Sequence, residues 1–582
     1  MLDPRILRAA LLPVLLVFVV VAFSLEDRPE PLRSTFAADA FDGERATGLL
    51  NRLDRTHPLR RAGSAGDAAL ARAVAAELAR ALPQVTVRTR VHRGETLDGA
   101  SDLVTVTAQE PGSLPRAQVV LVAQRDSAQD GAKADLSGTA ALVEIARAVA
   151  ASSPARSVTF ASISGASGGQ AGMRDLVRRL RRPVDAVIEI GDLAGDPGGK
   201  PVVVGWSAAP GAASVRLQRT VSLAVRREAG VAPGFPLART QLARYALPQS
   251  VSGQSVALAA GIPSVRLSLG GELPSRPGAK VTAERMQIFG RATLRVLDAL
   301  DGPLGAGPPA RDLAVAKKIL PGWAIRLLVA ALLLPATLLV GDGLARLRRR
   351  GESLIQEIAW VAALGVPVAG AALLGRALGL VGAIPELRTP APPGAVPLDG
   401  AALTALGCCA ALAALLVVLL RPWLGRRPAG SGAKPALALL LVTSALAWVA
   451  WLSNPYAALL LVLPLNVWLL LCAERVAVRR SLAVMLVLAS VAPVAMVLGL
   501  YASDLSMRFA EVPWFWMLAV AGGAVSLPAL LAWSLGAGLL TAALTLAARR
   551  QPDAGDKAVT VRGPLSYAGP GSLGGTDSAR RR

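Results

Sequence analysis

Seven long apolar runs in the second half of the chain limit what it can fold into. They cover residues 323–343, 355–381, 400–420, 435–452, 456–473, 481–502 and 513–547. A helix needs about 20 apolar residues to cross a bilayer, because its backbone polar groups must be satisfied within the segment. We therefore predict an α-helical polytopic membrane domain of about seven helices over 323–547. The last run is long enough for two short helices or for one helix kinked near Pro528, and we expect one.

The charge balance agrees with a membrane protein. The chain is 53% hydrophobic and has a formal net charge of +22. Many arginines lie in short loops beside apolar runs, where they act as topology signals, so we expect the lipid bilayer as a partner and no nucleic acid. The three cysteines, Cys408, Cys409 and Cys472, lie inside apolar runs and imply no disulfide framework.

The N-terminus predicts export of the segment that follows it. Arg5 and Arg8 precede an apolar run that extends from Ala9 to about Leu25. This pattern is typical of a signal peptide or a signal anchor. Because no small-x-small cleavage motif directly follows, we predict a transmembrane signal anchor over 1–25.

Arginine-rich loops alternate with arginine-poor loops along the membrane domain. The rich loops contain Arg346–Arg350, Arg426 and Arg427, Arg475 to Arg480, and Arg549 and Arg550; the poor loops are 382–399, 453–455 and 503–512. By the positive-inside rule, this alternation predicts eight crossings, cytoplasmic termini and residues 26–320 outside. We expect a multi-pass protein of the plasma membrane with an extracellular domain.

The remaining chain divides by composition. Residues 41–305 are patterned like a globular domain, between polar linkers at 26–40 and 306–322. Residues 548–582 are polar and rich in Gly, Ser and Pro, so we predict a disordered cytoplasmic tail.

The centre of the globular region reads as strand, helix, strand. Val119–Ala123 is a short apolar run, Ser137–Ala151 has apolar residues at helical spacing, and Ser157–Ile163 is rich in strand-forming residues. Such alternation predicts an α/β domain with a mixed, mostly parallel sheet flanked by helices.

Three motifs stand out in this region: Ala123-Gln124-Arg125-Asp126-Ser127, Gly131-Ala132-Lys133-Ala134-Asp135-Leu136-Ser137-Gly138 and Gly165-Ala166-Ser167-Gly168-Gly169-Gln170-Ala171-Gly172-Met173. They resemble motifs of the di-zinc aminopeptidases of peptidase clan MH (family M twenty-eight). A fourth, Ser252-Gly253-Gln254 through Gly261-Ile262-Pro263, resembles the segment before the family's last strand. The resemblance spans about residues 40–300, keeps the framework glycines and serines, and implies an exopeptidase-like fold.

The residues that would perform the family's chemistry are replaced. By the resemblance, Gln124 stands for a zinc-binding His, Ala134 for the bridging Asp, Ala166 for the general-base Glu, Ser167 for a Glu ligand, and Gly191 for an Asp ligand, with Asp192 one place off. Zinc takes His, Cys, Asp or Glu ligands, and alanine offers neither a ligand nor a base. We therefore expect no catalytic residue and no cofactor, zinc being the cofactor of the family. The pocket itself is expected to survive as a vestige, with Asp126, Asp135, Asp192 and Gln254.

Neither histidine of the chain lies at a ligand position. His57 belongs to a segment that resembles the family's early HPxRxxGS loop, and we expect it to be a loop residue. His92 alternates with polar neighbours, so we expect it on the surface of a strand.

Three functions remain open. The first is a pseudo-peptidase that binds or assembles a protein or peptide partner, in a layout similar to the attachment subunit of the GPI transamidase. The second is an active metallo-exopeptidase with substitute ligands, drawn from Asp126, Asp130, Asp135, Glu189 and Asp192. The third is a lipid-handling or transport protein with an accessory pseudo-peptidase domain. Few ionisable groups lie inside the apolar runs, which counts against a transporter. The arginines of the predicted helix 169–182 form a solvated basic face or a surface for an acidic partner or lipid headgroups.

Overall fold

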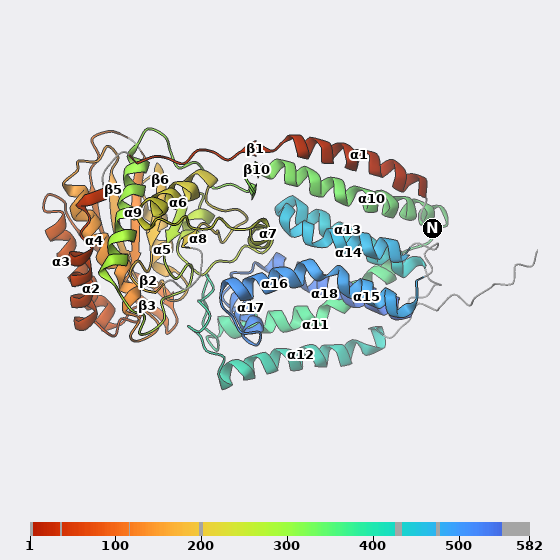
Figure 1. The fold of residues 1–582 in the computed structure, drawn as a ribbon. Helices are drawn as coiled ribbons and strands as arrows, with labels where there is room; N and C mark the ends of the chain where they lie inside the picture. Colours follow the sequence, from red (N-terminus) through yellow and green to blue (C-terminus); the bar gives the residue numbers. More distant parts are fainter. Residues whose placement is uncertain are drawn as a thin grey trace, which may run out of the picture.

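The computed structural model describes residues 4–34, 38–115, 117–196, 202–424, 433–472 and 478–549. The chain forms an α/β domain beside a bundle of long helices, as Figure 1 shows. Both parts of the expected fold class are confirmed. The predicted tail, Arg426, Arg427, Arg475 and Arg550 lie outside the described residues.

A seven-stranded mixed sheet forms the centre of the α/β domain. Its order is β2-β3-β5-β4-β6-β8-β7. The strands are β2 (Arg88–Thr96), β3 (Gly99–Glu110), β4 (Gln118–Gln124), β5 (Val158–Ile163), β6 (Val184–Ile190), β7 (Val203–Val204) and β8 (Ser264–Leu267). The inner strands β5, β4, β6 and β8 run parallel, whereas β2, β3 and β7 pair antiparallel at the two edges. The carboxyl ends of the four inner strands therefore meet at one edge of the sheet.

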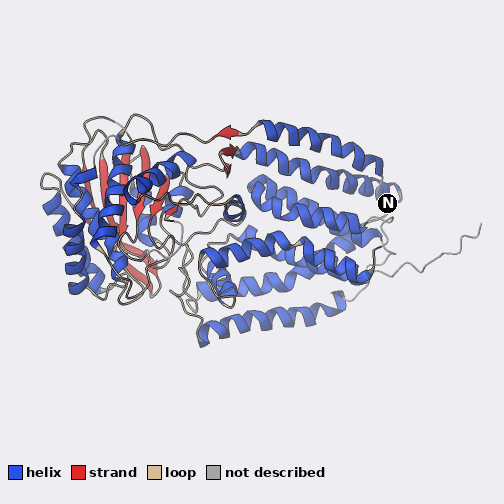
Figure 2. Ribbon diagram, in the orientation of Figure 1, coloured by secondary structure: helices blue, strands red, loops and turns tan. Residues whose placement is uncertain are grey.

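Helices cover both faces of the sheet, which Figure 2 shows as blue around red. Alternate residues of a strand point to opposite faces, so Leu121 packs in one layer and Val122 in the other. The larger layer contains α2 (Gly43–Thr56), α3 (Ala65–Ala81), α4 (Ser137–Ala150), α6 (Val215–Ala229) and α9 (Ala283–Asp301). The smaller contains α5 (Ala171–Arg179) and α8 (Gln254–Ala259). Burial on both faces explains why β4 contains the continuous apolar run Val119–Ala123.

Six helices of the described bundle are long and apolar enough to cross a membrane. They are α10 (Gly322–Arg349), α11 (Ile355–Leu380), α12 (Gly400–Leu424), α13 (Ala433–Ser453), α14 (Pro455–Cys472) and α18 (Leu527–Ala548). The pair α15 (Arg480–Ser490) and α16 (Ala492–Asp504), bent by 43°, passes the same test together. The shorter apolar helix α1 (Pro4–Phe23) lies along α10 (Figure 1). The chain is thus built as a multi-pass membrane protein.

The expectation of a single helix over the last apolar run is wrong. This run forms a short helix, α17 (Glu511–Ala521), and then α18. Gly523 adopts a positive φ of 75°, and Pro528 starts α18, where its fixed φ and missing N–H fit a first turn. The chain therefore turns at 522–526 instead of continuing as a kinked helix.

Two segments that look like linkers in the sequence pair with each other. β1 (Glu26–Asp27) pairs antiparallel with β10 (Lys318–Leu320), which also pairs with β9 (Leu313–Val315). β1 follows α1 and β10 precedes α10. This small sheet therefore lies where the chain passes from the bundle into the α/β domain and where it returns to the bundle (Figure 1).

The α/β domain also rests directly on the bundle. Asn454, between α13 and α14, donates from its side chain to the backbone oxygen of Tyr245 at 2.7 Å. The Tyr245 ring packs edge to face on Tyr456 of α14, with centroids 4.9 Å apart. Both tyrosines are buried, and Tyr245 belongs to α7 (Ala238–Ala246), so the bundle holds α7 in a fixed position.

Candidate functional site

A small pocket opens at the carboxyl ends of the parallel strands, the edge where open α/β sheets place their ligand sites. Its walls include Gln124, Asp126, Asp135, Ala166, Ser167, Gln170, Ser252, Arg266 and Glu272. A water-sized sphere can enter about 30 Å³ of it, which is room for only a few small atoms. The structure therefore brings most of the sequence-predicted positions together around one narrow space.

The turn after β5 is held by Asp126. Its carboxylate accepts the backbone N–H of Ala166 at 3.1 Å and that of Ser167 at 2.8 Å. Burial, with Asp67 nearby, raises the pKa of Asp126 above its usual range. Gln124, at the end of β4, lines the pocket, and its backbone oxygen accepts from Thr139 at 2.8 Å. Asp126 thus fixes the backbone conformation at Ala166 and Ser167, two of the positions that the motif resemblance predicts to be replaced.

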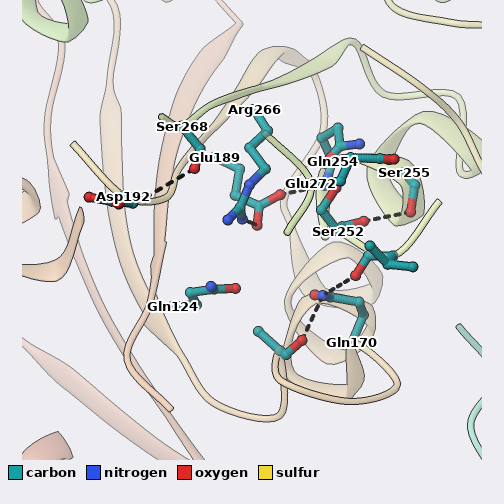
Figure 3. Close-up of polar contacts among 12 residues, drawn as sticks. Gln124, Gln170, Glu189, Asp192, Ser252, Gln254, Ser255, Arg266, Ser268 and Glu272 are labelled. Carbon is teal, nitrogen blue, oxygen red and sulfur yellow. Dashed lines mark hydrogen bonds and ion pairs between the residues drawn. The ribbon is translucent and has the colours of Figure 1, made fainter. Parts of the chain in front are cut away.

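Arg266 of β8 is the main cation of the pocket wall. The side chain is 2% exposed, and its Nη1 lies 2.5 Å from Oε1 of Glu189 on β6, which is fully buried. Its Nε donates to the backbone oxygen of Gly271 at 2.9 Å. A guanidinium buried at this depth needs such an anionic partner, because desolvation of a single charge is costly. Figure 3 shows Arg266 and Glu189 lying side by side.

The Arg266 guanidinium also fills the space at Gly191. A Cβ placed on Gly191 would lie 2.5 Å from Nη2 of Arg266 and 2.7 Å from Oγ of Ser268. No side chain at position 191 has room to reach the pocket while Arg266 keeps this position. Asp192, the next residue, accepts instead from Ala194 at 3.0 Å and from Gly195 at 2.7 Å.

Ala134 and Asp135 belong to the short turn η2 (Lys133–Leu136), and of the two only Asp135 is part of the pocket wall. Ala134 is buried, and its backbone oxygen accepts from Ser137 at 2.6 Å. Asp135 lines the pocket and accepts the N–H of Ser275 at 2.6 Å. Burial raises the pKa of Asp135 to about 6, which the Ser275 bond only partly offsets.

Two amides, Gln124 and Gln170, and the hydroxyl of Ser252 line the same space. Gln170 donates to the backbone oxygens of Ala166 and Val251, both at 2.9 Å, while its own Oε1 is buried without a hydrogen bond. The hydroxyl of Ser252 is likewise buried without one. Gln254, at the start of α8, donates its N–H to Glu189 at 2.6 Å and lies behind the pocket wall. Figure 3 shows the side chains of Gln124 and Gln170 directed into the space between them.

The residues present do not fit a pair of zinc ions. Among the described residues, no three His, Cys, Asp or Glu side chains are grouped to hold a metal ion. The carboxylates on the pocket wall are Asp126, Asp135 and Glu272, and each already has a donor or an ion-pair partner. Arg266 places a positive charge beside these carboxylates, and this charge disfavours the binding of a zinc ion there.

The two histidines lie elsewhere. His57 caps the end of α2, in a loop as expected. His92 lies on strand β2 as expected, but the expected surface position is wrong, since its side chain is 7% exposed and its Nδ1 lies 3.7 Å from Asp175 of α5. The helix α5 crosses the face of β2 and covers this residue, which alternation along a single strand does not reveal.

Several residues of the pocket escape the motif comparison. Arg266 and Glu189 are charged residues within otherwise apolar strands, and that pattern signals a buried ion pair across neighbouring strands. Glu272 is paired with Arg244 at 2.8 Å, and neither residue belongs to a motif. Pro392 and Ala395, which also line the pocket, come from the segment between α11 and α12, and no pattern in the sequence predicts their position.

Comparison with known proteins gives fold neighbours only. No protein-family model matches the chain, and no curated protein matches it in sequence. Among solved structures, it is similar to Fimbriiglobus ruber glutaminyl cyclase, with 14% identity and a TM-score of 0.34 over 47% of this chain and 99% of that one. It is similar to the Legionella pneumophila LapA aminopeptidase, with 13% identity and a TM-score of 0.35 over 45% and 72%. It is also similar to an aminopeptidase from Aneurinibacillus sp. strain AM-1, with 12% identity and a TM-score of 0.36 over 45% and 94%. At these values the likeness concerns the α/β architecture and not the activity.

Proposed function

We propose that the α/β domain is a non-catalytic binding or assembly module, presented at the outer face of the plasma membrane by the helical bundle. Its pocket would take part of a protein or peptide partner without cleaving it. The domain would need neither zinc nor another cofactor.

The observation that carries this proposal is the position of Arg266. Its guanidinium occupies the space of a side chain at position 191 and is paired with Glu189. Hydrolysis at a metal centre needs ligands and a base that takes a proton from water. Here the corresponding places hold Gln124, Ala134, Ala166 and Ser167.

Arginines at the ends of two membrane helices support the proposed outward orientation of the α/β domain. Arg346, Arg348 and Arg349 lie in the last turn of α10, and Arg480 starts α15. Both positions lie at the end of the bundle remote from the α/β domain (Figure 1). Arginine at helix ends favours the cytoplasmic side, which would leave the α/β domain outside.

The test is elemental analysis of the purified full-length protein beside an aminopeptidase assay with added zinc. We expect zinc well below one equivalent per chain and no hydrolysis above a blank. Stoichiometric zinc together with chelator-sensitive hydrolysis would instead support an exopeptidase with substitute ligands. Asp135→Asn is then the first variant to compare, because Asp135 is a substitute candidate that lines the pocket.

A further inference from the structure

The segment 384–396, here called the strap, lies between α11 and α12 and contributes to the wall of the pocket. Pro392 and Ala395 form part of the pocket wall. Ile384, Leu387, Thr389 and Ala391 are each less than 5% exposed. A connection between two membrane helices is thus buried between the α/β domain and the bundle, whereas a surface loop is normally solvated.

Leu387 joins the strap to both neighbours. Its side chain reaches the turn after β5, where its Cδ2 lies 3.0 Å from the place of a Cβ on Gly169. Gly169 has a φ of 81°, so this close approach depends on a residue without a side chain. The backbone of Leu387 likewise lies against Gly522 at the end of α17, so that a Cβ on Gly522 would collide with it.

The strap makes more extensive contacts with the bundle than with the α/β domain. Ile384, Val396 and Leu398 pack in one cluster with Trp514, Met517 and Leu518 of α17. The indole Nε1 of Trp514 also donates to the backbone oxygen of Val396 at 3.1 Å. Buried apolar contacts of this kind hold the strap to α17.

The contacts to the α/β domain are fewer and weaker. Arg174 of α5 donates to Oγ1 of Thr389 at 3.3 Å, and Arg388 lies 3.9 Å from Glu95 with a side chain that is 68% exposed. An exposed ion pair at this distance contributes little. Leu387 is therefore the main anchor on this side.

From these contacts we propose that the strap is an autoinhibitory lid. It closes the pocket by inserting Leu387 against the turn at Gly169, and it opens by leaving that turn while it stays attached to α17. This inference rests on the proposed use of the pocket as a binding site, because it assigns the control of access to that site. A partner that moves α17 or the α11–α12 connection would open the pocket, and a partner in the pocket would displace the strap.

The test measures access to the pocket without any ligand. The full-length protein carries Cys408→Ser, Cys409→Ser and Cys472→Ser, with Ser252→Cys as a probe, since Ser252 lines the pocket and is buried. The rate of labelling by a water-soluble maleimide is compared with and without Leu387→Ala. Leu380→Ala is the matched control, because Leu380 ends α11 beside the strap and is 63% exposed.

We expect slow labelling of Ser252→Cys, roughly tenfold faster labelling with Leu387→Ala, and no change beyond about twofold with Leu380→Ala. Labelling of the parent as fast as an exposed cysteine at position 130, or equal rates with and without Leu387→Ala, would overturn the lid. Hydrogen exchange of α4 checks that the fold is kept. If Leu387→Ala fails that check, Leu387→Val is used in its place, and the expected increase in the labelling rate is smaller. The labelling rates do not depend on zinc or hydrolysis, so the lid and the proposed function can fail separately.

Discussion

The guanidinium of Arg266 lies where a side chain on Gly191 would have to lie, with Nη2 2.5 Å from the Cβ position. The two residues come from the ends of neighbouring parallel strands, β8 and β6. Gly191 and Arg266 therefore act as a pair, since the missing side chain of one makes room for the long side chain of the other. The same guanidinium neutralises Glu189, the carboxylate just before this point on β6.

Gly191→Ala should destabilise the protein, because a single methyl group would press on Arg266 and Ser268. Overpacking of this kind costs about 1–3 kcal/mol. Thermal melting of the full-length protein in detergent measures the loss. Gly234→Ala is the matched control, since a Cβ on Gly234 has no atom within 4 Å and should change little. Equal melting temperatures for the two variants would contradict the packing of Arg266 at Gly191.

Arg266→Met should destabilise the protein more strongly, by about 3–5 kcal/mol, because it leaves Glu189 buried without a counter-charge. Glu189 is completely buried, so water cannot replace the guanidinium. The double variant Arg266→Met/Glu189→Gln removes both charges and keeps an acceptor for the N–H of Gln254. We expect it to melt above the single variant. A double variant that melts below Arg266→Met would show that the ion pair is not the reason for the loss.

Asp135→Asn should stabilise the protein at neutral pH. Burial raises the pKa of Asp135 to about 6, whereas an unfolded chain has a value near 3.9. Between these values the folded state binds more protons, so this group makes stability fall as pH rises from about 4 to 6. The amide cannot ionise, and its oxygen can still accept from Ser275.

The expected gain from Asp135→Asn is about 2 kcal/mol at pH 7.5, and it should vanish near pH 4. Melting curves at the two pH values measure it. Asp130→Asn, on the exposed part of the same loop, is the control. A gain that is the same at both pH values would rule out ionisation of Asp135 as the cause.

Arg244→Met should loosen the contact between the α/β domain and the bundle. Arg244 of α7 lies 2.8 Å from Glu272 on the pocket wall and 3.4 Å from Asp504 of α16, and it is almost fully buried. Removing it leaves two carboxylates without their partner, at a cost of about 3–5 kcal/mol. Arg244→Met/Glu272→Gln should recover part of the melting temperature. Failure of this rescue would mean that the stacking of Arg244 on Tyr501 is the larger contribution.

Cysteine labelling in intact cells should place the α/β domain outside. In a chain with the three native cysteines changed to serine, Asp130→Cys should react with a membrane-impermeant maleimide. Ser353→Cys, between α10 and α11, should react only after the cells are opened. Both positions are exposed in the fold, so burial does not decide the result. The reverse pattern would overturn the orientation.

The membrane helices and the centre of the α/β domain could be predicted from local pattern. Val119–Ala123, Ser137–Ala151 and Ser157–Ile163, expected as strand, helix and strand, correspond to β4, α4 and β5. Such elements follow from the spacing of apolar residues along one segment, and packing then adds to the preference.

Three features escaped the local pattern because they depend on contacts between distant segments. His92 is buried by α5, the last apolar run turns where Leu387 meets Gly522, and the linkers pair as β1 and β10. Local periodicity describes one segment at a time and does not tell which other segment will cover it.

The sequence by itself determined that this is a membrane protein with an α/β domain, and the motif resemblance predicts Gln124, Ala134, Ala166, Ser167 and Gly191 at the places of a metallopeptidase's ligands and base. Only the tertiary structure decided what fills the resulting space. Arg266 enters from β8. Pro392 and Ala395 also enter the wall, and they arrive from a connection between membrane helices that follows all four motifs in the chain. The sequence states which residue types are present at each position. Which side chains from distant segments come into contact depends on how the sheet, the helices and the bundle pack together.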